Sequence, residues 1–310
     1  MSERDDAVLV IDGVTKRYGQ IVALDSVSMM VPGGSIFGFL GPNGAGKTTL
    51  IRIIMGFMKA TSGHATMLGH DVWADGVRAR ERVGYLVTAD GLYPDLSGND
   101  QLDYAARISG RAPEWRRRIL DALELDEAAL RRKLTTYSKG MRQKLALTAA
   151  AQHRPELLIL DEPTDGLDPL IQRNFEELLR EFRADGTTVF MSSHDLGEVE
   201  RTCDRVAVIR AGRLITAGWM EDLKRRYQQR VEVVFDEGVP AGLGEVPGVV
   251  ILRSDDQSVL MSLEHDINPL LAFLARHRVA RMEVRPPELQ EVFLSFYERD
   301  TSGDSVEVPA

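Results

Sequence analysis

The sequence has little cysteine, no long apolar run and no excess of positive charge. A single cysteine, Cys203, excludes a disulfide within the chain and is typical of a reducing compartment. No apolar run approaches the roughly 20 residues that cross a bilayer, and the polar, acidic N-terminus shows no secretory signal. A formal net charge of −9 argues against a nucleic-acid-binding surface over the whole chain. These absences favour a cytosolic protein that does not bind nucleic acid.

The chain is long enough for more than one domain and apolar enough for a large core, with 310 residues of which 44% are hydrophobic. Residues 7–14 and 21–31 alternate as strands do, whereas residues 98–151 are helical and charged in pattern. From residue 157 to about 218, strand-like and helix-like segments alternate. Such alternation predicts a mostly parallel sheet with helices on its faces.

A glycine-rich segment at residues 41–49 matches G-x-x-x-x-G-K-[ST] and lies between a strand-like and a helix-like run. Glycines let successive backbone N–H groups face a phosphate, Lys47 adds a positive charge, and the Thr48 hydroxyl can bind Mg²⁺. The helix that begins near Lys47 directs its positive end at the same anion. The segment predicts a nucleoside triphosphate site made of Gly41, Pro42, Asn43, Gly44, Ala45, Gly46, Lys47, Thr48 and Thr49.

An apolar run at residues 157–160 is followed directly by Asp161 and Glu162. Four apolar residues in a row are typical of a strand covered on both faces. We expect Asp161 to hold Mg²⁺ through water and Glu162 to lie beside the attacking water. Phosphoryl transfer requires mainly such positioning and charge stabilisation. Together with Lys47, this pair predicts that the triphosphate is hydrolysed.

Residues 137–143 open an apolar helix shortly before the Asp161 strand. A serine hydroxyl and free N–H groups at a helix start can bind an anion, although an ordinary capped helix is the better explanation of the segment in isolation. The order and spacing of the three elements resemble those of ATP-binding cassette (ABC) ATPases. Ser138 and Gly140 match the family's usual Leu-Ser-Gly-Gly-Gln signature, whereas Lys139 replaces its first glycine.

The resemblance implies an active dimer, because in the family the signature closes over the γ-phosphate held by the facing subunit. The partner is expected to be a second copy or a similar ATPase. Asp168 is expected at the dimer seam, within a segment resembling the D-loop in which Asp165 replaces the usual serine. His194 resembles the switch histidine that contacts the γ-phosphate. Tyr18 resembles the residue that stacks on adenine.

One position departs from the family pattern. Residues 83–90 align with a strand and loop that normally end in a metal-binding glutamine, and Thr88 stands at that position. We expect Thr88 to offer one oxygen to the metal. Asp90 is close enough in sequence to do so instead, and the sequence does not decide between them.

The resemblance covers roughly residues 7–222 and implies the fold. We expect an α/β P-loop NTPase (RecA-like) core with an antiparallel β subdomain and a helical subdomain at about 98–151, all within residues 1–225. After the charged junction at 224–226, strand and helix patterns predict a small α+β domain over residues 226–300, followed by a disordered tail at 301–310. The last helix of this domain is expected to open at Pro286, with Pro at its start.

Such an extension resembles that of ATPase subunits of bacterial drug and antibiotic exporters, whose permease is a separate chain. The resemblance implies an ATPase that uses ATP and Mg²⁺ at the cytoplasmic face of the membrane. A permease is expected to dock near residues 88–96, where Leu92, Tyr93 and Leu96 offer apolar contacts. A soluble ABC ATPase acting on ribosomes or DNA is the alternative, but such relatives usually carry two cassettes or a long coiled coil. A P-loop kinase would leave the signature and His194 unexplained.

Overall fold

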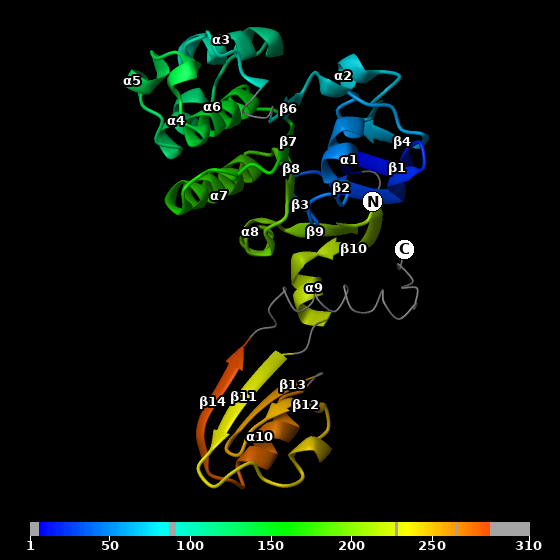
Figure 1. Cartoon of the computed structure of the whole chain (residues 1–310), viewed down its shortest axis with the longest axis vertical. Helices are drawn as coiled ribbons and strands as arrows, with labels where there is room; N and C mark the ends of the chain where they lie inside the picture. The colour runs from blue at the N-terminus through cyan, green and yellow to red at the C-terminus, as the bar shows by residue number, and fades with distance from the viewer. Residues whose placement is uncertain (1–5, 87–90, 227–228, 264–265, 286–310) are drawn as a thin grey trace. The chain divides into compact units, whose positions relative to one another are not determined.

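The computed structural model describes residues 6–86, 91–226, 229–263 and 266–285. The chain divides into two compact units, Met1–Gly218 and Trp219–Ala310 (Figure 1). This division precedes the boundary expected at 225/226, because the charged junction is part of a helix, α9 (Met220–Arg226), that belongs to the second unit. Thr88, the expected final helix from Pro286 and the tail at 301–310 lie outside the described residues.

A six-stranded sheet forms the centre of the first unit, in the order β10-β9-β3-β8-β7-β6. Its strands are β3 (Ile36–Leu40), β6 (Val83–Tyr85), β7 (Leu157–Asp161), β8 (Thr188–Ser193), β9 (Arg205–Arg210) and β10 (Arg213–Trp219). The pairs β6–β7, β7–β8, β8–β3 and β3–β9 are parallel. The carboxyl ends of these strands therefore meet at one edge of the sheet, where open α/β sheets bind their ligands.

Helix α1 (Lys47–Ile54) follows β3 and leads to the second sheet, whereas α7 (Pro169–Ala184) joins β7 to β8 and α8 (Leu196–Thr202) joins β8 to β9. Helix α7 begins where the Asp168 side chain accepts a hydrogen bond from the Ile171 amide, with Pro169 at its first position. A proline is tolerated there because its missing N–H would have no partner in the helix. These helices cover strands that are buried along their whole length, β3 and β8 among them.

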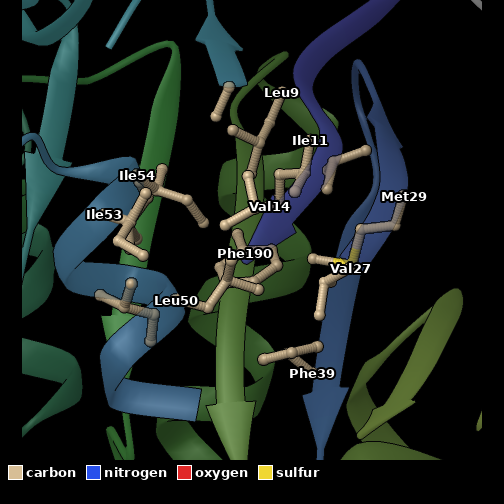
Figure 2. Close-up of a cluster of buried hydrophobic side chains, with 14 of the residues drawn as sticks. Leu9, Ile11, Val14, Val27, Met29, Phe39, Leu50, Ile53, Ile54 and Phe190 are labelled. Atoms are coloured by element: carbon tan, nitrogen blue, oxygen red, sulfur yellow. The ribbon is translucent and has the colours of Figure 1, made fainter. Parts of the chain in front are cut away.

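A second sheet of the first unit is antiparallel, in the order β2-β1-β4-β5. It consists of β1 (Ala7–Tyr18), β2 (Ile21–Pro32), β4 (Ser62–Met67) and β5 (His70–Asp71), and the short helix α2 (Gly76–Arg80) follows it. Its apolar side chains share one core with α1 and the central sheet, as Figure 2 shows for Leu9, Ile11, Leu50 and Phe190. This shared core holds α1, and with it the loop at 41–46, against both sheets.

The expected helical subdomain is present between β6 and β7. It contains α3 (Gly98–Ser109), α4 (Arg116–Ala122), α5 (Glu127–Leu130), the 3₁₀ turn Leu134–Thr136 and α6 (Lys139–Ala151). Helices α3 and α4 pack on α6, and Figure 1 shows α3 to α6 as one cluster. A reciprocal capping box between Ser97 and Asp100 begins α3. None of the helices in the described ranges is long and apolar enough to span a membrane.

The second unit is a small α+β fold with a core of its own. Beyond α9 it contains β11 (Gln229–Phe235), the 3₁₀ turn Leu243–Glu245, β12 (Val249–Ser254), β13 (Ser258–Leu263), α10 (Asn268–Leu274) and β14 (Val279–Arg285). The strands form an antiparallel sheet in the order β12-β13-β11-β14. Leu270 and Leu274 of α10 belong to one apolar cluster with Val231, Val233 and Phe235 of β11. This cluster shares no residue with the core of the first unit.

Candidate nucleotide site

The loop between β3 and α1 is held in a shape that only glycine permits. Gly46 caps α1 with a φ of 110°, and a Cβ added there would lie 2.7 Å from the Ala23 carbonyl oxygen. A Cβ at Gly41 would lie 2.4 Å from the Ile209 carbonyl oxygen. Both positions therefore require the hydrogen side chain of glycine. This is the close backbone arrangement that a phosphate needs in order to reach several N–H groups.

Lys47 is 5% exposed and its ammonium group lies on the inside of this loop. Its Nζ donates hydrogen bonds to the Gly41 carbonyl at 2.6 Å and to the Pro42 carbonyl at 3.3 Å. It also lies 3.1 Å from Glu162 Oε1. A buried ammonium needs such partners because burial without them is costly. A phosphate at the loop would bring negative charge to the same ammonium.

Glu162 links Lys47 to His194. Its second carboxylate oxygen, Oε2, lies 2.8 Å from His194 Nδ1, within hydrogen-bonding distance. His194 directly follows β8 and Glu162 directly follows β7, and these two strands are parallel neighbours. The structure thus brings together the three residues that the sequence analysis predicted to be catalytic, at the carboxyl edge of the central sheet.

Ser192, which the sequence analysis did not identify, holds the Asp161–Glu162 pair. Its Oγ donates to Asp161 Oδ1 at 2.5 Å and accepts from the Glu162 amide at 3.1 Å. Ser192 lies opposite Asp161 in the β7–β8 register, so only strand pairing reveals this contact. Glu162 has a positive φ of 49°, a conformation that is uncommon for a residue other than glycine and that persists only where neighbours hold it.

Thr48 and Asp161 are the predicted metal ligands that the structure describes. Thr48 is exposed in the first turn of α1, and Asp161 ends β7. In the described parts of the chain, no cluster of three or more His, Cys, Asp or Glu side chains could hold a metal by itself. This donor set fits Mg²⁺, which usually takes one or two protein ligands together with phosphate oxygens and water.

The predicted signature residues lie at the exposed N-terminus of α6. Ser138 caps the helix, because its Oγ accepts a hydrogen bond from the Met141 amide at 3.2 Å. Tyr137 is buried, and its hydroxyl donates to the Ala129 carbonyl at 2.7 Å, which anchors the helix start to α5. Lys139 is exposed and Gly140 partly so. Ser138, Lys139 and Gly140 can therefore meet a ligand or a second chain.

Asp168 and Tyr18 have contacts of their own within the chain. Asp168 caps α7, which by itself accounts for an aspartate at this position. Tyr18 ends β1 and is 46% exposed; its hydroxyl lies 2.8 Å from Met58 Sδ, and Lys16 Nζ lies 5.2 Å from the ring centre. The ring is exposed enough to stack on a nucleotide base. The Lys16 ammonium is attracted by the electron-rich face of the ring.

A groove of about 620 Å³ lies between α2, β6, α3 and α6. Its lining includes Leu92 and Tyr93, two of the three residues expected to contact a permease, but not Leu96. Leu92 is buried, so the exposed apolar surface comes mainly from Val77, Tyr93, Tyr104 and Ile108. Val77, Tyr104 and Ile108 were not expected from the sequence, because Val77 lies on α2 and the other two on α3, and only the fold brings these helices to one groove.

Two buried ionisable groups flank these sites. Burial raises the pKa of Glu198 on α8, although hydrogen bonding opposes the shift, and Ser193 Oγ donates to Glu198 Oε2 at 2.5 Å. Burial lowers the pKa of His153 in the wall of the groove, although a hydrogen bond to the Val83 backbone opposes the shift. In both cases, burial favours the uncharged form. Ser193 directly precedes His194, so Glu198 also supports the end of β8.

Comparison with known proteins agrees with this geometry. The family model for ABC transporters matches residues 24–165. The daunorubicin resistance ATP-binding protein DrrA3 of Streptomyces coeruleorubidus is 33% identical over 304 residues, covering 93% of this chain and 95% of that protein. A solved ATP-binding subunit of an ABC transporter is 30% identical, with a TM-score of 0.65 over 70% of this chain and 92% of its own. A bacterial ABC transporter cassette solved as a dimer is 25% identical, with a TM-score of 0.62 over 68% of this chain and 98% of its own.

The glycine loop, the buried Lys47 and the parallel sheet define the protein as a P-loop ATPase. The relatives are matched over nearly their whole length, and they narrow the class from P-loop ATPases in general to one family. The chain belongs to the ABC transporter family and is an ATP-binding and ATP-hydrolysing subunit of such a transporter. The fold and the function expected from the sequence are thereby confirmed.

Proposed function

We propose that this ATPase powers an exporter of drug-like compounds through a separate membrane permease, as one half of a nucleotide-bound dimer at the cytoplasmic face of the membrane. The observation that carries the proposal is the groove between α2, β6, α3 and α6, whose exposed Val77, Tyr93, Tyr104 and Ile108 suit an apolar partner segment. The drug-resistance role in the name of the relative from Streptomyces supports the exporter assignment.

Lys47 and Glu162 would change partners when ATP binds. The Lys47 ammonium would turn from Glu162 toward the β- and γ-phosphates, because their charge exceeds that of one carboxylate. Glu162 would then be free to accept a proton from the attacking water as the water oxygen bonds to the γ-phosphorus and the bond to ADP breaks. His194, 2.8 Å from Glu162, would orient this carboxylate and contact the γ-phosphate.

The residues that would hold Mg²⁺ are Thr48, through its hydroxyl, and Asp161, through water; Thr88 is a further candidate from the sequence. When bound, the ion would offset charge on the phosphate oxygens. Ser192 would keep Asp161 turned toward this position through its 2.5 Å hydrogen bond. Tyr18 would stack on adenine, with 46% of its surface exposed.

Dimerisation would complete the site, since the start of α6 in one copy would face residues 41–49 of the other. Three features support this arrangement: the exposure of Ser138 and Lys139, the free N–H groups expected at a helix start, and the solved dimer of a related cassette. Asp168 would lie at the seam between the copies. We favour two copies of this chain, and a similar second ATPase would serve equally.

Membrane co-sedimentation with a candidate permease tests the proposal. Tyr93→Ala combined with Ile108→Asp should abolish association of the ATPase with permease-containing membranes and leave ATP binding intact, because both side chains lie in the groove. Val250→Asp is the control, since Val250 is also an exposed apolar residue but belongs to the second unit. Undiminished association of the double variant, or association of the wild type with ribosomes or DNA instead of membranes, would contradict the proposal.

A further inference from the structure

The start of α6 contacts the loop that follows Glu162 in the same chain. Residues 163–168 form this loop, the post-Glu162 loop. Lys139 Nζ lies 2.7 Å from Asp165 Oδ2 in an ion pair. The methylene groups of Lys139 cover Gly166, because a Cβ added at Gly166 would lie 3.2 Å from Lys139 Cδ and Cε. Lys139 thus lies against the loop from its Cγ to its Nζ.

Two further contacts lie deeper in the same junction. The Gln143 side chain, on a residue only 6% exposed, donates a hydrogen bond of 2.8 Å to the carbonyl of Pro163, the residue directly after Glu162. A Cβ at Gly140 would lie 2.9 Å from the Gly166 carbonyl oxygen, so the helix and loop backbones approach closely there. The first two turns of α6 therefore hold the post-Glu162 loop at three places.

The position of this loop matters for Glu162. The Glu162 backbone has the uncommon φ of 49°, and such a conformation persists only when its surroundings determine it. Ser192 fixes the residue from the strand side and Gln143 fixes the next carbonyl from the helix side. A shift of the loop would therefore turn the Glu162 carboxylate away from Lys47 and His194.

The charge of Asp165 also requires compensation. Asp165 and Lys139 are the two residues that replace the usual serine and glycine of the D-loop and the signature, and their side chains are 62% and 63% exposed. Without Lys139, the Asp165 carboxylate would stand as a net negative charge on the loop between Glu162 and Asp168. Negative charge there would oppose the approach of a triphosphate held by a second copy.

We propose that Lys139 is a positioning residue for ATP hydrolysis, which holds and neutralises Asp165 so that the post-Glu162 loop presents Glu162 in its working orientation. Binding of the second copy's triphosphate at the start of α6 is thereby linked to the catalytic base, Glu162, of the same chain. The inference rests on the proposed role of Glu162 and on the proposed dimer. Because exposed ion pairs contribute little to stability, the pair should act on the rate of hydrolysis and hardly on folding.

A double-mutant cycle tests the pair, with Lys139→Gln, Asp165→Asn and the two combined. Lys139→Gln should lower kcat by about 10-fold, the size expected when a catalytic group is misplaced, because it leaves Asp165 uncompensated. The double variant should recover to within about twofold of the wild type, since a neutral amide pair can still form a hydrogen bond. The affinity of the single subunit for ATP should stay constant, because the contacts of Lys47 are unchanged.

Glu127→Gln combined with Arg131→Gln is the matched control, since this exposed ion pair on the neighbouring α5 lies at 3.4 Å and away from the loop. It should leave kcat unchanged. Lys139→Arg, which keeps the charge, should retain most activity. A double variant no more active than Lys139→Gln, or a change in KM without a change in kcat, would overturn the inference. The Glu162→Gln variant, measured in parallel, reports separately on whether Glu162 is the base.

Discussion

The carboxylate of Glu162 lies between two partners, with Oε1 at 3.1 Å from Lys47 Nζ and Oε2 at 2.8 Å from His194 Nδ1. The lysine is the first residue of α1, directly after the phosphate loop, the glutamate directly follows β7 and the histidine directly follows β8. One carboxylate thus connects the phosphate-binding loop with two further strand ends. Substitution of each of these three residues should therefore alter a different property of the enzyme.

Glu162→Gln should bind ATP normally and hydrolyse it at least about 100-fold more slowly, because general-base catalysis typically contributes that much. ATP-bound dimers should accumulate, and size-exclusion chromatography with ATP would detect them. Glu177→Gln, a change on the exposed face of α7, is the control and should hydrolyse ATP at the wild-type rate. Wild-type turnover by Glu162→Gln would show that another group accepts the proton.

Lys47→Ala should weaken ATP binding itself. Loss of one charge-assisted hydrogen bond costs about 1.5–3 kcal/mol, which corresponds to roughly 10- to 100-fold in affinity. Titration with a fluorescent ATP analogue would measure the change, and Lys59→Ala provides a control lysine outside the site. Unaltered affinity in Lys47→Ala would contradict the assignment of the loop as the phosphate site.

Glu198→Gln should stabilise the protein at neutral pH, since burial raises the pKa of Glu198 in the folded state. The stabilising contribution of the protonated carboxyl is fully present below its unfolded pKa and is lost as the pH rises through its folded pKa. Glutamine stays neutral, so the advantage of the variant should grow across this pH window and then level off. Urea unfolding at several pH values, with Glu177→Gln as the control, would detect the trend. A difference in the free energy of unfolding between Glu198→Gln and the wild type that does not change with pH would argue against a buried protonated carboxyl.

A chain that ends at Arg226 should still fold and bind ATP. The core of the first unit and the core around Val231 and Leu270 share no residues, and every proposed nucleotide contact precedes residue 200. We expect the shortened chain to lose dimer formation or binding to the permease instead. Circular dichroism, ATP titration and light scattering on the shortened chain would separate these effects. A fragment that folds but no longer binds ATP would show that the second unit contributes to the nucleotide site.

Much of the fold could be predicted from the sequence because its signals are local. The strands at 7–14 and 21–31 were expected and correspond to β1 and β2. The short β4 and β5 were not expected, because β4 opens with Ser62 and Gly63 and carries little strand propensity. The metal-site prediction at Thr88 stays a prediction, because this residue lies outside the described part of the chain.

The sequence by itself determined the phosphate loop, since its glycines, Lys47 and Thr48 fall within nine consecutive residues. It likewise determined the start of α6 at Ser138, where the cap and its amide partner are three residues apart. Tertiary structure decided which distant side chains meet. Ser192 reaches Asp161 through strand register, and Lys139 reaches Asp165 because α6 packs beside the post-Glu162 loop. Such contacts depend on how elements pair and pack, which no local pattern in the chain encodes.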